Sequence, residues 1–470
     1  MGINAVNVSW FAAPCELDVG FSVLGASVGF TAEDPRKLND VEGEDAGYGF
    51  VVISSRVSVE DFDSAHEAAR YARPGELVIL GILSYLTGYH FSVYDNVCSR
   101  SAKEPAEIDD LSLSSNGDVP IWLLNEGTDL TLDLEMLVKA IQDEPEDERN
   151  LLFSLLDRWR RAQFLLQESE AGLHHEEAYL GFFHVLELLA MRYAGDQRVE
   201  AEERLREFVT DLLASTLKMR GPKLDQAMKA KVKGLKELLL SPETFSISQR
   251  VLYMLDQYDV LEPRIHKLVE DLVKTRNQIA HGRTTFRQGL VWPVPPFFSI
   301  LSQHSDLVEV LCVFSARVVA LRYGLSSWGT QWQETLDVLD PPWDIVRSFV
   351  QSDAPASMSR ADFQSGVIDN VRPGSLVRAY LHEKIAFRYL ERTLRRYLLD
   401  TTDPDDLPDE LTLAVVVLAD ASDEELAGHC QQLVPDLVEH RLGVFPKDIL
   451  RMLEDRRRSA RWFREYLQRS

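Results

Sequence analysis

Hydrophobic and polar positions change their spacing near residue 150. Before that point the apolar residues form short stretches. Gly47 to Val59 (GYGFVVISSRVSV) is rich in β-branched and aromatic residues and predicts a strand. Asp61 to Tyr71 predicts a helix that ends before Pro74, and Val119 to Leu124 predicts a further strand. We therefore expect an α+β region at the N-terminal end.

From about Leu151 the spacing becomes that of long helices. Residues 151–167 place apolar side chains at helical intervals, and residues 176–193 are apolar on nearly every side, which predicts a helix buried in a bundle. Further helices are expected at 198–219, 223–240, 261–280, 298–323, 374–398, 422–434 and 446–467. The expected fold class is mainly α, with a central helical bundle, an N-terminal α+β domain and a helical C-terminal block.

One stretch is long enough to raise the question of a membrane span. Leu77 to Tyr94 is a run of 18 uncharged residues between Glu76 and Asp95. It contains Gly, Ser, Thr, Tyr and His, whereas a spanning helix needs about 20 predominantly apolar residues, and its flanks are acidic. We expect a buried helix followed by a strand, and no membrane partner.

The distribution of charged residues distinguishes the N-terminal part of the chain from the rest more clearly than the hydrophobic pattern does. The formal net charge of −25 argues against a general polyanion binder and against adhesion to anionic membranes. Residues 1–150 carry 9 basic and 28 acidic side chains (net −19), whereas the remaining 320 carry 41 and 47 (net −6). Residues 142–149 (QDEPEDER) are typical of a linker or of the cap of a following helix. We expect domains at 1–149, 150–325 and 326–470.

The cysteines lie far apart and form neither a CxxC pair nor a Cys/His cluster: Cys15, Cys98, Cys312 and Cys430. This pattern predicts no zinc module and no disulfide framework, and it favours a reducing, cytoplasmic location. No GxxxxGK(S/T), strand-linked GxGxxG, HExxH or GxSxG motif occurs. We expect no cofactor and no metal.

Asp271 to Gly282 (DLVKTRNQIAHG) carries the most informative combination of residues. Arg276 and His281 lie about 140° apart on a helix, so they do not share a face, whereas Asn277 and His281 do, at i and i+4. A single copy therefore makes an incomplete site. Two copies related by a twofold axis could line one cleft.

These residue types suit RNA cleavage without a metal. His281 can exchange protons near neutral pH, and Arg276 offers a fixed positive charge for phosphate oxygens. Asn277 can orient the substrate or the imidazole. A structural interpretation is also open, because Arg276 can neutralise carboxylates and the helix dipole favours a histidine near a C-terminus.

The same residues carry a family resemblance. The Arg276-Asn277 pair followed by His281 resembles the Arg-x4-His motif of the HEPN superfamily, and the helix containing GFFHVLELLAMRY (181–193) is similar to that superfamily's second helix. The resemblance covers about 150–325, and within the superfamily it is closest to the ApeA-like HEPN proteins of bacterial anti-phage defence.

The resemblance implies a HEPN-type bundle that works as a homodimer. Arg276, Asn277 and His281 would be the catalytic residues of a metal-independent endoribonuclease. Its substrate would be RNA, with tRNA as one candidate. A role in abortive infection would add a phage-derived trigger. The acidic domain at 1–149 would then serve as a sensor or lid, because its charge repels RNA.

His184 and Glu187 are polar interruptions in an otherwise apolar helix. A buried charge is costly unless it is paired. One interpretation gives Glu187 an internal partner, such as Arg192 or another helix. The other makes Glu187, with His184, a group that orients Arg276 or His281.

A local reversal of charge follows this helix. Residues 218–236 contain seven basic residues and a single acid, and Lys229, Lys233 and Lys236 fall at i, i+4 and i+7. This stripe predicts either an RNA-binding face or ordinary solvated lysines. The rival to an enzyme is a non-catalytic HEPN module that binds a protein partner, with the acidic domain mimicking nucleic acid.

Overall fold

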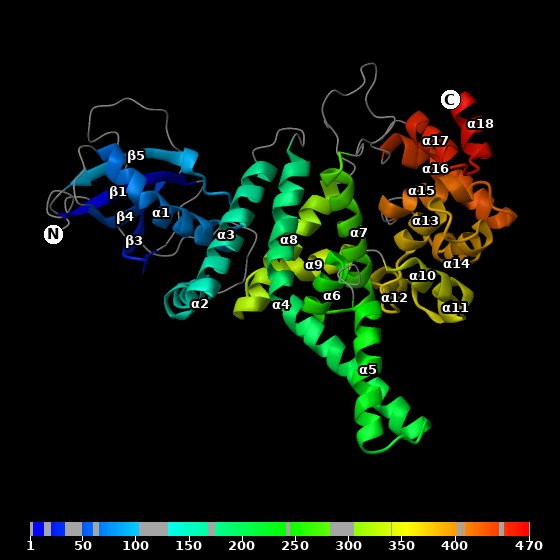
Figure 1. Cartoon of the computed structure of the whole chain (residues 1–470). Helices are drawn as coiled ribbons and strands as arrows, with labels where there is room; N and C mark the ends of the chain where they lie inside the picture. Colours follow the sequence, from blue (N-terminus) through cyan, green and yellow to red (C-terminus); the bar gives the residue numbers. More distant parts are fainter. Residues whose placement is uncertain are drawn as a thin grey trace. The chain divides into compact units, whose positions relative to one another are not determined.

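The chain divides into two units in the computed structural model, residues 1–335 and 336–470, and each is described by itself (Figure 1). The fold is mainly α, with a small antiparallel sheet at the N-terminal end and a helical C-terminal block, as the sequence predicts. The structure describes residues 3–13, 20–32, 49–59, 65–102, 130–167, 174–240, 245–282, 305–339, 341–401, 407, 409–440 and 446–469.

Five antiparallel strands form the sheet, in the order β2-β3-β4-β1-β5. The predicted strand at Gly47–Val59 is confirmed over the residues of β4, whereas Val119–Leu124 lies outside the described residues. Alternation along β1 places Val8 and Trp10 in a small apolar cluster. The strands are β1 (Ile3–Ala13), β2 (Phe21–Val23), β3 (Ala26–Thr31), β4 (Gly49–Val59) and β5 (Asn96–Ala102).

Helix α1 (Ala65–Thr87) packs against the sheet and runs straight through Pro74. The expected end of this helix before Pro74 is therefore wrong. A proline inside a helix removes one backbone donor, the one that would bond the carbonyl of Arg70. Arg70 is exposed, so water can reach that turn, while the apolar residues that follow gain burial by staying helical.

The apolar run after Glu76 is helical to Thr87 and then passes through the short helix η2 (Val93–Asp95) into β5. This confirms the expected buried helix followed by a strand. Within the described ranges, no helix is long and apolar enough to cross a membrane.

Glu76 is buried between α1 and the sheet. Its Oε1 accepts hydrogen bonds from Ser9 (2.6 Å) and Asn7 (3.3 Å), and Arg73 lies 3.7 Å from its Oε2. Desolvation raises the pKa of this carboxyl, although the bond from Ser9 and the charge of Arg73 oppose the shift.

The rest of the first unit is a helical bundle. The expected boundary at 149/150 falls inside α3, so residues on both sides of it belong to one helix. The expected helices at 176–193 and 198–219 form parts of a single longer helix, α4, that ends in a π-helical turn, η5. The elements are α2 (Leu130–Asp143), α3 (Glu146–Gln167), α4 (His175–Asp211), η5 (Leu212–Thr216), α5 (Pro222–Leu239), α6 (Ile247–Gln257), α7 (Pro263–Ala280), α8 (Ser305–Tyr323) and α9 (Gly329–Val338).

Close packing on α3 positions α4. A Cβ atom on Gly181 of α4 would lie 2.8 Å from the Cβ of Ala162, so only glycine permits this approach. On another side of α3, a Cβ on Gly81 of α1 would lie 3.1 Å from Leu156. Helix α3 is thus held tightly between α1 and α4, which fixes where α4 presents its side chains.

Helices are the only regular secondary structure among the described residues of the second unit. Its core surrounds α15, whose Val415, Val416 and Val417 are all buried. The expected helix at 374–398 is two helices, α13 and α14, and that at 446–467 is α17 and α18; the one at 422–434 lies largely within α16. The bounds are α10 (Trp343–Gln351), α11 (Ala354–Ser357), α12 (Arg360–Ser365), α13 (Pro373–Leu381), α14 (Phe387–Leu399), α15 (Asp409–Leu418), α16 (Glu424–His440), α17 (Pro446–Asp455) and α18 (Arg461–Arg469).

Candidate functional site

Helix α7 carries the Arg-x4-His motif at its C-terminal end. Pro263 occupies the first turn, where a missing backbone donor costs nothing, and apolar side chains at helical spacing bury one face. The helix stops after Ala280. Gly282 adopts a φ of +60° and donates its N–H to the carbonyl of Ile279, while His281 is the C-cap residue. The motif therefore lies across a helix end.

The guanidinium of Arg276 has partners on two helices. Its Nη2 donates to Oε1 of Glu187 on α4 at 2.9 Å, and its Nη1 donates to Oδ1 of Asn277 at 3.2 Å. The ring of Phe183, one turn before Glu187, lies 6.0 Å from the guanidinium carbon. The Arg276 side chain is 30% exposed and that of Glu187 is 20% exposed. The arginine is thus fixed in direction and still reaches solvent.

His184 extends this cluster along α4. Its Nε2 lies 3.8 Å from Oε2 of Glu187, one turn along, and forms an ion pair with it only when the imidazole is protonated. The side chain is 42% exposed. Glu187 thus uses one oxygen toward Arg276 and directs the other toward a titratable imidazole.

The two sequence interpretations of Glu187 can be compared with this geometry. Arg192 pairs instead with Glu148 of α3, which also accepts from Arg322 of α8. The partner of Glu187 is Arg276 on α7, a contact that fits both an internal ion pair with another helix and the orienting interpretation. Whether the contact serves catalysis stays a prediction.

His281 stands apart from these side chains. It is exposed, and its backbone N–H donates to the carbonyl of Asn277 at 3.2 Å. Within the part of the chain that the structure describes, its imidazole makes no hydrogen bond or ion pair. The structure thus brings together Arg276, Asn277, Glu187 and His184, and leaves His281 at the adjacent helix end.

Aromatic side chains beneath the cluster were not anticipated from the sequence. Tyr179 stacks on Phe183 and donates its hydroxyl to the carbonyl of Leu272 on α7 at 2.8 Å. Burial raises the pKa of Tyr179, so it remains a neutral donor that ties α4 to α7. Tyr179, Phe183 and Glu187 recur every four residues, and this spacing is the signal that could have identified them.

Comparison with known proteins adds no family to this geometry. No family model matches the sequence, and the searches of curated proteins and of solved structures give no match either. The resemblance to the HEPN superfamily therefore rests on the quoted motif and its helical setting. Any functional assignment has to be argued from the side chains themselves.

The three lysines of the predicted RNA-binding stripe lie elsewhere, on α5. Lys229 and Lys233 are exposed, whereas the Nζ of Lys236 lies 2.6 Å from Oε1 of Glu202 on α4. A lysine already paired with a carboxylate is a weaker phosphate ligand. Over the described residues, no hydrogen bond or ion pair joins this stripe to Arg276, Asn277, Glu187 or His184.

The cluster offers acid-base and electrostatic chemistry. An imidazole can move protons near neutral pH, and a guanidinium can bind phosphate oxygens in its plane. Among the described residues, no group of three or more His, Cys, Asp or Glu side chains could hold a metal ion. A guanidinium suits phosphate and carboxylate oxygens alike, because its planar fork of donors matches both.

Proposed function

We propose that the chain is a HEPN-type, metal-independent endoribonuclease. The observation that carries this proposal is the arrangement at the end of α7, where Glu187 and Asn277 hold Arg276 and an exposed His281 caps the same helix. An oriented, partly exposed arginine and an exposed histidine on one helix end supply two of the groups that cleavage of a phosphodiester at a 2′-hydroxyl needs. The family resemblance of the motif supports the same conclusion.

Each side chain has a role in the proposed reaction. One imidazole removes the proton of the 2′-hydroxyl, which attacks the adjacent phosphorus and displaces the 5′-oxygen of the next nucleotide. A second proton donor returns a proton to that leaving oxygen. Arg276 stabilises the charge that develops on the non-bridging oxygens, and Asn277 orients the imidazole or the substrate.

The reaction requires more groups than one copy presents. A base, an acid and a cation have to face one phosphate, while one chain places Arg276 and His281 on different sides of a helix end. In the proposed homodimer, the two copies of Arg276, Asn277 and His281 line one cleft.

The family resemblance also supports a biological context for this activity. We place the enzyme in bacterial anti-phage defence by abortive infection, with cellular RNA such as tRNA as the substrate and a phage-derived trigger. The acidic residues of 1–149 restrain it, because a region with a net charge near −19 repels RNA until it is displaced.

A second candidate is a non-catalytic helical module that binds a protein partner. One observation favours it: Arg276 already has a carboxylate and an amide as partners within its own chain. A structural arginine is satisfied in the same way. In this alternative Arg276 and Glu187 only join α4 to α7.

Cleavage assays with point variants separate the two. Purified wild type, His281→Ala and His266→Ala are incubated with total RNA and with tRNA in EDTA. His266 is an exposed histidine of the same helix, with its Nδ1 3.5 Å from Oε1 of Glu270, and serves as the matched control. We expect wild type and His266→Ala to cleave, and His281→Ala to lose at least about a hundredfold in rate.

Equal cleavage by His281→Ala would place the activity elsewhere and contradict the proposal. If no variant cleaves, expression in cells is decisive. Toxicity that His281→Ala abolishes and His266→Ala retains supports a latent enzyme, whereas an absence of toxicity supports the binding module.

A further inference from the structure

The second half of α4, the turn η5 and helix α5 form a hairpin arm, residues 195–240. The main contacts of α5 are with α4 and η5, and the two helices extend together from the other helices of their unit (Figure 1). Helix α5 has 18 residues, and none of its side chains is fully buried. Tertiary packing supplies most of the stability of a helix in a protein. A helix of this length without a fully buried side chain is therefore only weakly stabilised by contacts within its own chain.

Two apolar stripes run along the end of α4 and into η5. Val209 on α4 and Leu213 in η5 are buried and form one of them. Leu205, Phe208 and Leu212 form the other, at i, i+3 and i+7. Phe208 is 62% exposed and Leu212 is 41% exposed. Since Phe208 and Val209 are about 100° apart around the helix, the second stripe faces sideways and α5 does not cover it.

Other large apolar side chains on the arm are also exposed. Leu217, at the turn between the helices, is 61% exposed, and Leu238 on α5 is 73% exposed. Isolated exposed leucines are ordinary, but Phe208 and Leu212 lie one turn apart, so that together with the half-buried Leu205 they form one apolar strip along the helix.

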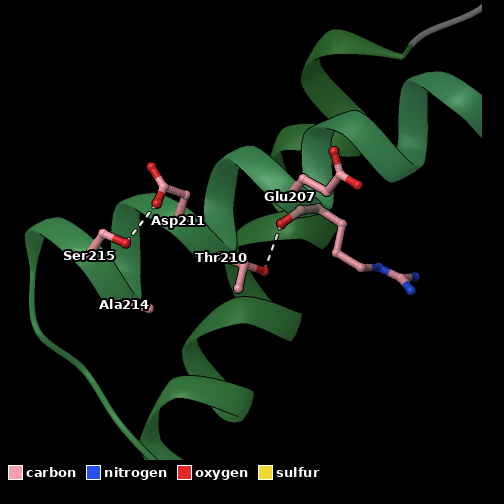
Figure 2. Close-up of a pocket in the computed structure, with 6 residues that line it drawn as sticks. Glu207, Thr210, Asp211, Ala214 and Ser215 are labelled. Atoms are coloured by element: carbon pink, nitrogen blue, oxygen red, sulfur yellow. Dashed lines mark hydrogen bonds between the residues drawn. The ribbon is translucent and has the colours of Figure 1, made fainter.

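The two helices of the arm carry opposite charges. On α4, residues 195–211 have six acidic and three basic residues, and Glu203, Glu207 and Asp211 are exposed, as are Arg204 and Arg206. Figure 2 displays Glu207 and Asp211 one turn apart, and Asp211 accepts a hydrogen bond from Ser215 at 2.6 Å. These side chains and Arg206 line a shallow hollow of about 420 Å³.

On α5, the exposed charges are mainly positive. Lys223, Lys229 and Lys233 point to solvent. From residue 217 to 240 the chain has seven basic and two acidic residues. The arm is thus a hairpin whose first helix has a net negative charge and whose second has a net positive charge, with exposed apolar side chains at Phe208 and Leu212.

We infer that the arm docks against the arm of a second copy of this chain, forming a four-helix bundle with α4 of each copy against α5 of the other. This pairing covers Phe208 and Leu212 and brings the acidic side chains of α4 opposite the basic side chains of α5. Placing α4 against α4 would oppose like charges. A twofold axis makes both contacts at once.

RNA is the other partner that the lysines suggest. It fits the arm less well, because a phosphate backbone would leave Phe208 and Leu212 exposed and would lie close to the carboxylates of α4. The inference deepens the proposed function, which requires two copies, but its test measures mass and not cleavage. Failure of one is therefore distinguishable from failure of the other.

The test is a charge exchange in the full-length chain, measured by sedimentation equilibrium in low salt. We expect a dimer for wild type. Glu207→Lys with Asp211→Lys should weaken it at least about tenfold, as should Lys229→Glu with Lys233→Glu, because each places like charges across the contact. All four substitutions together should restore the dimer, a result that misfolding cannot produce.

Apolar substitutions provide an independent measurement. Phe208→Ser with Leu212→Ser should also weaken the dimer, while Met191→Ser, at a position that is 61% exposed on α4 outside the arm, should not. A wild-type monomer at tens of micromolar would overturn the inference. So would a quadruple variant that stays monomeric, or lysine variants that lose RNA binding and keep the wild-type dimer constant.

Discussion

Arg276 is bonded to a carboxylate and to an amide within its own chain, and this sets what an incoming phosphate would meet. The Glu187 carboxylate keeps the guanidinium plane in one orientation. It also lowers the net charge of the pair to zero. Glu187 therefore either positions Arg276, as the proposed reaction requires, or competes with the phosphate for Arg276.

Glu187→Gln distinguishes these roles. We expect kcat to fall about tenfold to a hundredfold with little change in KM, because a neutral amide holds the arginine less firmly and small misplacements are costly. Steady-state cleavage of a defined RNA measures both constants. Glu177→Gln is the control, since that carboxylate lies on the same helix and is 61% exposed. A lower KM with an unchanged kcat would identify Glu187 as a competitor only.

The sequence predicted the polar residues of the site better than their connections. Spacing on α4 placed Glu187 among apolar residues and so required a partner. Which arginine pairs with Glu187, Arg192 or Arg276, depends on Glu148 of α3, because Glu148 forms an ion pair with Arg192. Such a choice is made by the packing of three helices, and no local pattern encodes it.

At the scale of elements, the sequence located most of the long helices and erred at their ends. Glu383 and Arg457 adopt positive φ values and end α13 and α17, with backbone bonds from Lys384 to Ala379 and from Arg458 to Leu453. Glycine is the usual residue at this position of a helix end. Without that signal, the patterns at 374–398 and 446–467 read as continuous helices.

Asp133 shows how one side chain can define an element boundary. It is buried in the first turn of α2, and its carboxylate accepts from the backbone and hydroxyl groups of Ser326 and Ser327, just before α9. Asp133→Ala would leave these donors without an acceptor. We expect the free energy of unfolding of the first unit to fall by about 2–4 kcal/mol.

Urea denaturation followed by tryptophan fluorescence measures this change. Glu135→Ala, at an exposed position of the same helix, should change the free energy of unfolding by less than about 0.5 kcal/mol. If Asp133→Ala also changed the free energy of unfolding by less than about 0.5 kcal/mol, water would be replacing the carboxylate as the acceptor without loss of stability.

At the scale of the whole molecule, the N-terminal sheet and the bundle share one unit. The hydroxyl of Tyr85 on α1 donates to the carbonyl of Ala316 on α8 at 2.9 Å, and Nε1 of Trp328 donates to the carbonyl of Tyr85 at 3.0 Å. Deleting residues 1–149 would therefore remove α1 from the bundle core. A deletion is the wrong test of a lid.

Neutralising acidic side chains in residues 1–149 tests the proposed restraint without deleting part of the first unit. We expect Glu42→Gln, Glu44→Gln and Asp45→Asn together to raise RNA cleavage at least about threefold at low salt, with the gain shrinking as salt screens the charge. Cleavage rates are measured at two ionic strengths. The triple variant Asp403→Asn, Asp405→Asn and Asp406→Asn loses the same charge and is the control. An equal increase in cleavage rate for the two triple variants would show a general effect of net charge. It would contradict the proposed restraint by residues 1–149.

The contact between α1 and the bundle has an optical consequence. The rings of Trp159 and Trp328 lie 5.3 Å apart, inclined at 62°, and Tyr85 lies against both. All three are fully buried. Aromatic rings held this close in a fixed, asymmetric geometry couple their electronic transitions. The near-ultraviolet circular dichroism of these three rings therefore reports on the packing of α1 against the helical bundle.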